Sequence, residues 1–196
     1  MVIKMSSINH DNMQHYKNVV PPVAIRLLMI TEAAPLPEEN YFYNNISSND
    51  YLHGASRSFF RGIMQGIGLL PIGVSVYSER VLLDAFTKEG YFFIDSCPVP
   101  LIDEAGVQLS SDKKRKIMVN YADSLLETIK ALQSEKILFV CSTNKVVMDK
   151  LKGQQYISDR LLLALPLPYP GVGWLKRPDR KGFMDLFPDC YRLAAI

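Results

Sequence analysis

Cysteine is scarce in this chain, and its spacing excludes several kinds of site. The three cysteines, Cys97, Cys141 and Cys190, lie far apart among 196 residues, and no CxxC pair occurs. Zinc ribbons, thioredoxin-like centres and disulfide scaffolds depend on closely spaced or paired cysteines, so the sequence argues against all three. This cysteine usage is typical of a reducing compartment. We therefore expect a cytoplasmic protein without a metal ion.

Long apolar runs and nucleotide-binding motifs are also missing. No run of 18 apolar residues occurs, and the polar N-terminal residues contain no apolar signal segment, so we expect a soluble protein with no membrane partner. The motifs GxxxxGK[ST], GxGxxG, GxSxG and HExxH are absent, which removes the main support for kinase-like, dehydrogenase-like and hydrolase-like functions. The formal net charge of +2 neither requires nor excludes a nucleic-acid partner.

Short buried strands alternate with amphipathic helices along the chain. Strands are predicted at 25–30, 91–95, 137–140 and 161–165, and helices at 55–67, 79–88, 110–136, 144–152 and 180–194. This alternation predicts an α/β fold in which helices cover both faces of a central, mostly parallel four-stranded sheet. We expect a flexible N-terminal arm over residues 1–18 and a single domain over residues 19–196.

Three loops follow predicted strands and carry polar groups, proline or glycine. They are Thr31–Pro35, Asp95–Pro100 and Pro166–Trp174, with Pro98 expected to end the second strand directly after Asp95. In doubly wound sheets the ligand site forms outside the carboxyl ends of the strands. The three loops are therefore the candidate site.

Glu32 and Asp95 are acids that come just after two of these strands. Two carboxylates that face one crevice can divide general-base and electrostatic roles between them. The alternative is that either acid caps the helix or turn that follows it.

Two further segments contain side chains suited to a nucleobase. Tyr51 could stack on a planar base and His53 could donate to it, although Tyr51 packed on the next helix and His53 in solvent are the simpler alternative. The loop that contains Trp174 and Leu175 combines a flexible glycine with an apolar tip and adjacent cations. This combination suits a wedge that enters a base stack. The alternative is that Trp174 lies in the core. The residues of this loop expected to contact DNA are Gly171, Trp174, Leu175, Lys176 and Arg177.

A second basic run, Lys113–Lys116, opens the longest predicted helix. Cations at this end oppose the helix dipole. A phosphate partner would relieve the conflict, but solvation of the four side chains is the simpler expectation.

The order of these segments resembles the uracil-DNA glycosylase superfamily, in its iron–sulfur branch. Thr31-Glu32-Ala33-Ala34-Pro35 is similar to the first motif of that branch, Gly-Glu-Ala-Pro-Gly. The resemblance continues over about Ile25 to Leu186, in short motifs whose order matches better than any single one. These motifs are 51–69, with its aromatic residue, glycine and helix; 92–95, where the family has asparagine; 137–153; and 167–171, in place of His-Pro-Ser.

This resemblance implies a uracil-DNA glycosylase-like fold and hydrolysis of the N-glycosidic bond of a flipped base in DNA, as in base excision repair. Glu32, Asp95 and Tyr169 would be catalytic, and Ala33, Tyr51, His53 and Asp95 would bind the base. Asp95 and Tyr169 stand where the family has asparagine and histidine. Three scattered cysteines cannot hold a four-thiolate cluster, so no cofactor is expected. The expected partner is DNA or a nucleobase-containing ligand, bound by a monomer.

Two other functions fit the same residues. One is a catalytically inert relative that recognises a base or nucleic acid without hydrolysis, which the loss of the family's histidine favours. The other is a small-molecule hydrolase of a different class that uses Glu32 or Asp95 as its base.

Overall fold

The computed structural model describes residues 21–33, 42–43, 51–53, 58–71, 74 and 76–167. The predicted arm at 1–18 and the predicted last helix at 180–194 lie outside these ranges. Six α-helices and five strands are present in the described part of the chain.

Three parallel strands form the central sheet, in the order β4-β1-β5. They are β1 (Leu27–Ala33), β4 (Tyr91–Cys97) and β5 (Lys136–Phe139). In the register, Leu27 lies beside Tyr91 on one side and Lys136 on the other. Leu28, Met29 and Ile30 of the central strand are fully buried, because both faces of the sheet are covered, and this confirms the strand type that the apolar run predicts.

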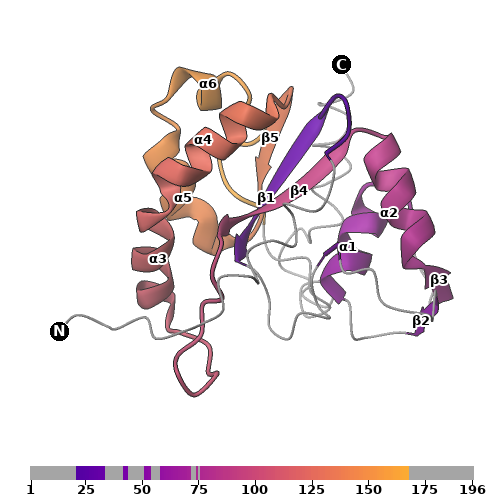
Figure 1. Cartoon of the computed structure of the whole chain (residues 1–196), viewed down its shortest axis with the longest axis horizontal. Coiled ribbons are helices and arrows are strands. Elements are labelled where there is room, and N and C mark those ends of the chain that lie inside the picture. The colour runs from indigo at the N-terminus through magenta and orange to yellow at the C-terminus, as the bar shows by residue number, and fades with distance from the viewer. Residues whose placement is uncertain are drawn as a thin grey trace.

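One face of the sheet is covered by α1 (Ser58–Gly66) and α2 (Glu79–Lys88), which Figure 1 shows to the right of the strands. Apolar side chains from both helices pack with alternate residues of the strands in one core cluster, which includes Met29 and Phe93. The sequence predicts α2 with the bounds observed. Ser78 caps its first turn by accepting a hydrogen bond from the Val81 N–H, at 3.4 Å.

The other face is covered by α3 (Ser111–Asn120), α4 (Ala122–Leu132), α5 (Lys145–Leu151) and α6 (Gln155–Ser158). Figure 1 shows all four on the opposite side of the sheet from α1 and α2. Their apolar side chains form a second core cluster with the other set of alternating strand residues, such as Ile30 and Ile94. The molecule therefore has helices on both faces of a parallel sheet, as expected. No helix in the described residues has the length and apolar character needed to cross a bilayer.

Both β1 and β4 continue further than the sequence predicts. Thr31–Ala33 extend β1 beyond its predicted end at residue 30, and Ser96 and Cys97 extend β4 beyond its predicted end at Asp95, which pairs with Thr31 in the register. Pro98 does end β4, but a proline removes only its own N–H from the ladder. The two preceding residues therefore stay in the sheet.

The long predicted helix at 110–136 is two helices, which meet at Tyr121. The apolar stripe runs across this break because α3 and α4 cover the same face of the sheet. The periodicity therefore gives no sign of the break.

The predicted strand at 161–165 is reduced to two isolated parallel bridges. Leu161 pairs with Ile137 and Leu167 pairs with Val140, along the outer edge of β5. Pro166 has no N–H to donate, and the intervening residues form no continuous ladder. The described sheet therefore has three strands, and the fourth of the prediction is seen only as these bridges.

Candidate functional site at the carboxyl ends of the strands

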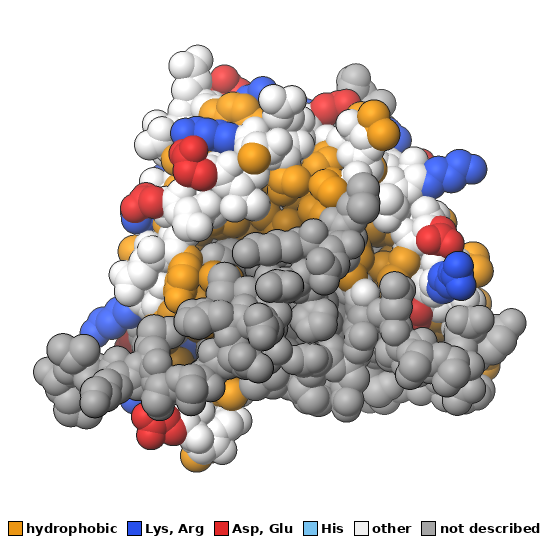
Figure 2. All heavy atoms as spheres, in the orientation of Figure 1, with side chains coloured by type: hydrophobic (Ala, Val, Ile, Leu, Met, Phe, Trp, Pro, Cys, Tyr) orange, Lys and Arg blue, Asp and Glu red, His pale blue; other side chains and the backbone are white. Residues whose placement is uncertain are grey.

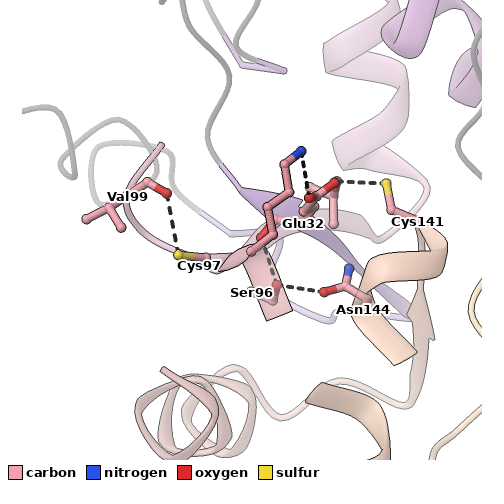
Figure 3. A network of polar contacts seen from close by, with 8 residues as sticks. Glu32, Ser96, Cys97, Val99, Cys141 and Asn144 are labelled. Atoms are coloured by element: carbon pink, nitrogen blue, oxygen red, sulfur yellow. Dashed lines mark hydrogen bonds and ion pairs between the residues drawn. The ribbon is translucent and has the colours of Figure 1, made fainter. Parts of the chain in front are cut away.

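The connections of the chain diverge at the carboxyl ends of the central strands. From β1 the chain crosses to β4 through α1 and α2 on one face, and from β4 it passes to β5 through α3 and α4 on the other. The adjacent ends of β1 and β5 are therefore a topological switch point, where α/β sheets place their ligand sites. The last residues of all three strands meet there in a network of polar contacts (Figure 3).

Asn144 joins the ends of the three strands. It ends the short 3₁₀ turn η4 (Ser142–Asn144) after β5 and is fully buried. Its amide Nδ2 donates to the carbonyl oxygens of Ile30 in β1, at 3.1 Å, and Val140 after β5, at 2.6 Å. Its Oδ1 accepts from the Ser96 hydroxyl of β4, at 2.7 Å. The side chain thus uses both amide hydrogens and its oxygen.

Ser96 links this amide to the backbone of the first acid. Its Oγ lies 2.8 Å from the carbonyl oxygen of Glu32 and 2.7 Å from Asn144 Oδ1. A hydroxyl carries one proton, so Ser96 donates to only one of these two acceptors at a time. Either way, the carbonyl of Glu32 is held close to the end of β4.

The side chain of Glu32 is paired with a lysine from α3. Lys114 Nζ lies 3.2 Å from Glu32 Oε1, and the two side chains are 18% and 22% exposed. Among the described residues this buried oxygen has no partner with hydrogen-bond geometry, so the contact is an ion pair and Oε1 can still accept a directed hydrogen bond. This ion pair gives Lys114, one of the four cations of the basic run 113–116, a structural role. Arg115 pairs within the same helix, with Asp112.

Asp95 points to the other face of the sheet. It is 8% exposed, and it lies beside Thr31 in the register and on the same strand face as Phe93. The Thr31 hydroxyl is 3.6 Å from the sulfur of Cys141, the second residue after β5. Side chains alternate along a strand, so Glu32 faces α3, whereas Asp95 faces the side of α1 and α2.

Tyr43 lies close to Asp95 on the edge of the sheet. Its hydroxyl accepts a hydrogen bond from the Phe93 N–H, at 2.7 Å. Burial raises the pKa of Tyr43 well above its ordinary value, and the nearby charge of Asp95 raises it further. Tyr43 is therefore a neutral phenol at physiological pH.

Neither described cysteine has the properties of a nucleophile. Burial raises the pKa of Cys97 to about 11 and that of Cys141 to about 12, and the charges of Glu32 and Asp95 add to both effects. A thiolate is the reactive form, so these thiols are inert at neutral pH. Both acids are close enough to act on both sulfurs, which places the two carboxylates at one end of the sheet although they face opposite sides.

Cys141 also has an unusual backbone conformation, with φ of 73° and ψ of 127°. A side chain rarely adopts this region, and such geometry costs about 1–3 kcal/mol. The turn after β5 brings Asn144 into contact with the carbonyls of Ile30 and Val140, so the network holds a strained connection in place.

The structure places the other predicted site residues in different regions. Ala33 ends β1 and packs against the core on the α3 side. Tyr51 and His53 belong to β2 (Tyr51–His53), which pairs antiparallel with β3 (Val76–Ser78). Figure 1 shows this pair near the outer end of the α1 and α2 layer, away from the carboxyl ends of the sheet. The remaining predicted residues lie outside the described ranges: Tyr169, Gly171, Trp174, Leu175, Lys176 and Arg177.

On the described surface that Figure 2 shows, basic and acidic side chains are intermixed and do not form a patch of one sign. Figure 2 shows basic and acidic side chains interspersed around the edges of one face, with hydrophobic side chains between them. In the described part of the chain, no group of three or more His, Cys, Asp or Glu residues could hold a metal ion.

Comparisons of the chain with protein-family models, with curated proteins and with solved structures find no match. The assignment of a function therefore depends on the site itself. Asn144 and Ser96 are its most strongly connected residues. Ser96 lies within the predicted site loop 95–100, although no role is predicted for it, and Asn144 lies outside the three predicted loops. The segment 141–144 follows a predicted strand, so the rule that selected the other loops would also have selected this one.

Proposed function

We propose that the protein is a divergent uracil-DNA glycosylase-like enzyme that hydrolyses the N-glycosidic bond of a flipped base in DNA. The observation that supports this most is the position of Glu32 and Asp95 at the carboxyl ends of adjacent parallel strands. The strand order β4-β1-β5 gives a topological switch point between the ends of β1 and β5, so Glu32 lies beside it and Asp95 lies on the other neighbour of β1. The resemblance of the sequence motifs supplies the reaction.

In this proposal Asp95 contacts the base. Its carboxylate is largely buried, and a carboxylate accepts hydrogen bonds but cannot donate them when ionised. It would therefore select a base edge that carries an exocyclic amine, as in cytosine-like or purine-like bases. The protonated form would donate instead.

Glu32 would act on the attacking water. The water oxygen bonds to the sugar C1′ as the bond between C1′ and the base nitrogen breaks; the base leaves with the electron pair, and the proton released by the water finally reaches the base. A carboxylate near C1′ stabilises the oxocarbenium-like transition state. Lys114 would hold the carboxylate of Glu32 in place and keep it ionised through the ion pair at 3.2 Å.

The test is a panel of oligonucleotides that contain uracil, hypoxanthine, xanthine or a mismatch, incubated with excess protein and assayed for abasic product. We expect product with at least one base, and a loss of at least about 100-fold in Glu32→Gln and Asp95→Ala, the scale of losing a positioned catalytic group. Asp112→Asn is the matched control, because this acid is exposed and lies on α3. Absence of product with every base, or undiminished turnover in Glu32→Gln, would contradict the proposal.

A nucleobase-binding protein without catalysis is the second candidate. It is favoured by the pairing of Glu32 with Lys114 and by the opposite orientations of the two acids. Product formation by the wild-type protein separates the two functions, and Lys114→Met tests the part that the ion pair plays in the enzyme. For the enzyme we expect the rate of product formation to fall about tenfold. For a binding protein we expect base affinity without product in every variant. Lys113→Met is the control, because Lys113 is the exposed neighbour on the same helix.

A further inference from the structure

We infer that Ser96 and Asn144 are positioning residues for Glu32, and this inference rests on the proposed hydrolysis. The two side chains connect three strand ends that are far apart in the sequence: Ile30 and Glu32 in β1, Ser96 in β4 and Val140 after β5. Figure 3 shows them meeting beneath Glu32. Neither side chain has an accessible surface for substrate, since Ser96 is 1% and Asn144 is 0% exposed.

The hydrogen bonds fix the backbone on both sides of the acid. The Ile30 carbonyl, two residues before Glu32, accepts from the Val140 N–H at 2.8 Å as well as from Asn144 Nδ2. The Glu32 carbonyl, just after its side chain, lies 2.8 Å from Ser96 Oγ and shares the single hydroxyl proton with Asn144 Oδ1. The direction of the Cα–Cβ bond of Glu32 is therefore set by contacts from two other strands.

The carboxylate of Glu32 has only one other restraint among the described residues, the ion pair with Lys114. An ion pair without hydrogen-bond geometry restrains the distance between the lysine nitrogen and the carboxylate oxygen more than it restrains the direction of the carboxylate. The network around Ser96 and Asn144 restrains the backbone from which this side chain projects. A misplacement of about 1 Å in a reacting group can lower a rate about 100-fold.

Ser96→Ala is the main test, because it removes the donor and leaves both Asn144 amide bonds in place. Ser96→Thr keeps the hydroxyl and should restore function. Ser134→Ala is a matched control. Ser134 is also 1% exposed, its hydroxyl has no hydrogen-bond partner in the described part of the chain, and it precedes β5 at the opposite end of the sheet.

Two measurements are made on the full chain. In single turnover, we expect Ser96→Ala to form abasic product 10- to 100-fold more slowly while DNA affinity stays within twofold of wild type. By hydrogen exchange, we expect the amides of residues 31–33 to exchange about tenfold faster in Ser96→Ala. Ser134→Ala and Ser96→Thr should match wild type in both measurements.

The two measurements separate the inference from the proposed function. Wild-type protein that forms no abasic product overturns the hydrolysis, and exchange at 31–33 then still decides whether Ser96 restrains Glu32. If Ser96→Ala exchanges at 31–33 like Ser134→Ala, or cleaves as fast as wild type where wild type is active, the positioning role is overturned.

Discussion

Replacing Asn144 by alanine should be among the most destabilising single changes in the described sheet. The variant loses three hydrogen bonds of one fully buried side chain. Ile30 O keeps its bond from the Val140 N–H, and Ser96 keeps the Glu32 carbonyl as acceptor. The Val140 carbonyl loses the 2.6 Å bond from the amide, which is the largest single loss.

The magnitude follows from these bonds. A buried carbonyl left without its donor costs about 1–3 kcal/mol, and each of the other two bonds contributes about 1 kcal/mol. We expect Asn144→Ala to lower the free energy of unfolding by about 3–5 kcal/mol, measured by urea denaturation. Asn120→Ala, the same substitution at the exposed end of α3, should change it by less than about 0.5 kcal/mol.

Asn144→Asp adds a test in which the direction of the change in stability with pH is defined. The new carboxyl would face two carbonyl oxygens, so its neutral form is favoured in the folded protein and its pKa rises above the unfolded value of about 3.9. Stability relative to wild type should be best below about pH 4 and should fall as the pH rises, by more than about 1 kcal/mol between pH 5 and pH 8. A loss below about 1 kcal/mol in Asn144→Ala, or a cost in Asn144→Asp that does not change with pH, would refute the hydrogen-bonding described for Asn144.

Two further predictions concern the thiols and the turns. Iodoacetamide at pH 8 should label Cys97 and Cys141 only after unfolding, and labelling of either thiol in the native protein would contradict this. The free energy of unfolding should also decline as the pH rises above 9, because the folded pKa values of about 11 and about 12 exceed the ordinary value of 9.0. Gly90→Ala should destabilise the protein at least about 1 kcal/mol more than Gly106→Ala in urea denaturation. Both glycines have positive φ, but a Cβ at Gly90 would lie 2.9 Å from Arg26 Cγ, whereas nothing lies within 4 Å at Gly106; equal losses would refute the close approach.

The sequence predicts the layers of the fold well, because burial and helical periodicity are local properties. The apolar run at 27–30 gives the central strand, and α2 lies between a capping Ser78 and Gly90 with its predicted bounds. The ends of β1 and β4 are less predictable. Residues 31–33 and 96–97 are predicted as loops, but they stay in the strands because neighbouring strands supply hydrogen-bond partners.

The site is only partly predictable for the same reason. Glu32 and Asp95 can be selected from their positions after apolar runs, but strand alternation, which turns them to opposite faces, depends on where each strand ends. Asn144 looks like an ordinary polar residue before a helix. Its importance depends on carbonyls of Ile30 and Val140, and Ile30 is more than 100 positions away in the chain.

The central claim is that the carboxyl ends of β4, β1 and β5 bind a nucleobase. The most direct test is an NMR titration of the full chain with free uracil, cytosine, hypoxanthine and xanthine, which follows the backbone amides. We predict saturable shifts for at least one base at Thr31 and Asp95, with Ser134 at the opposite end unchanged, and loss of these shifts in Asp95→Ala. No saturable shift at Thr31 or Asp95 with any base, or shifts confined to other parts of the chain, would contradict the account.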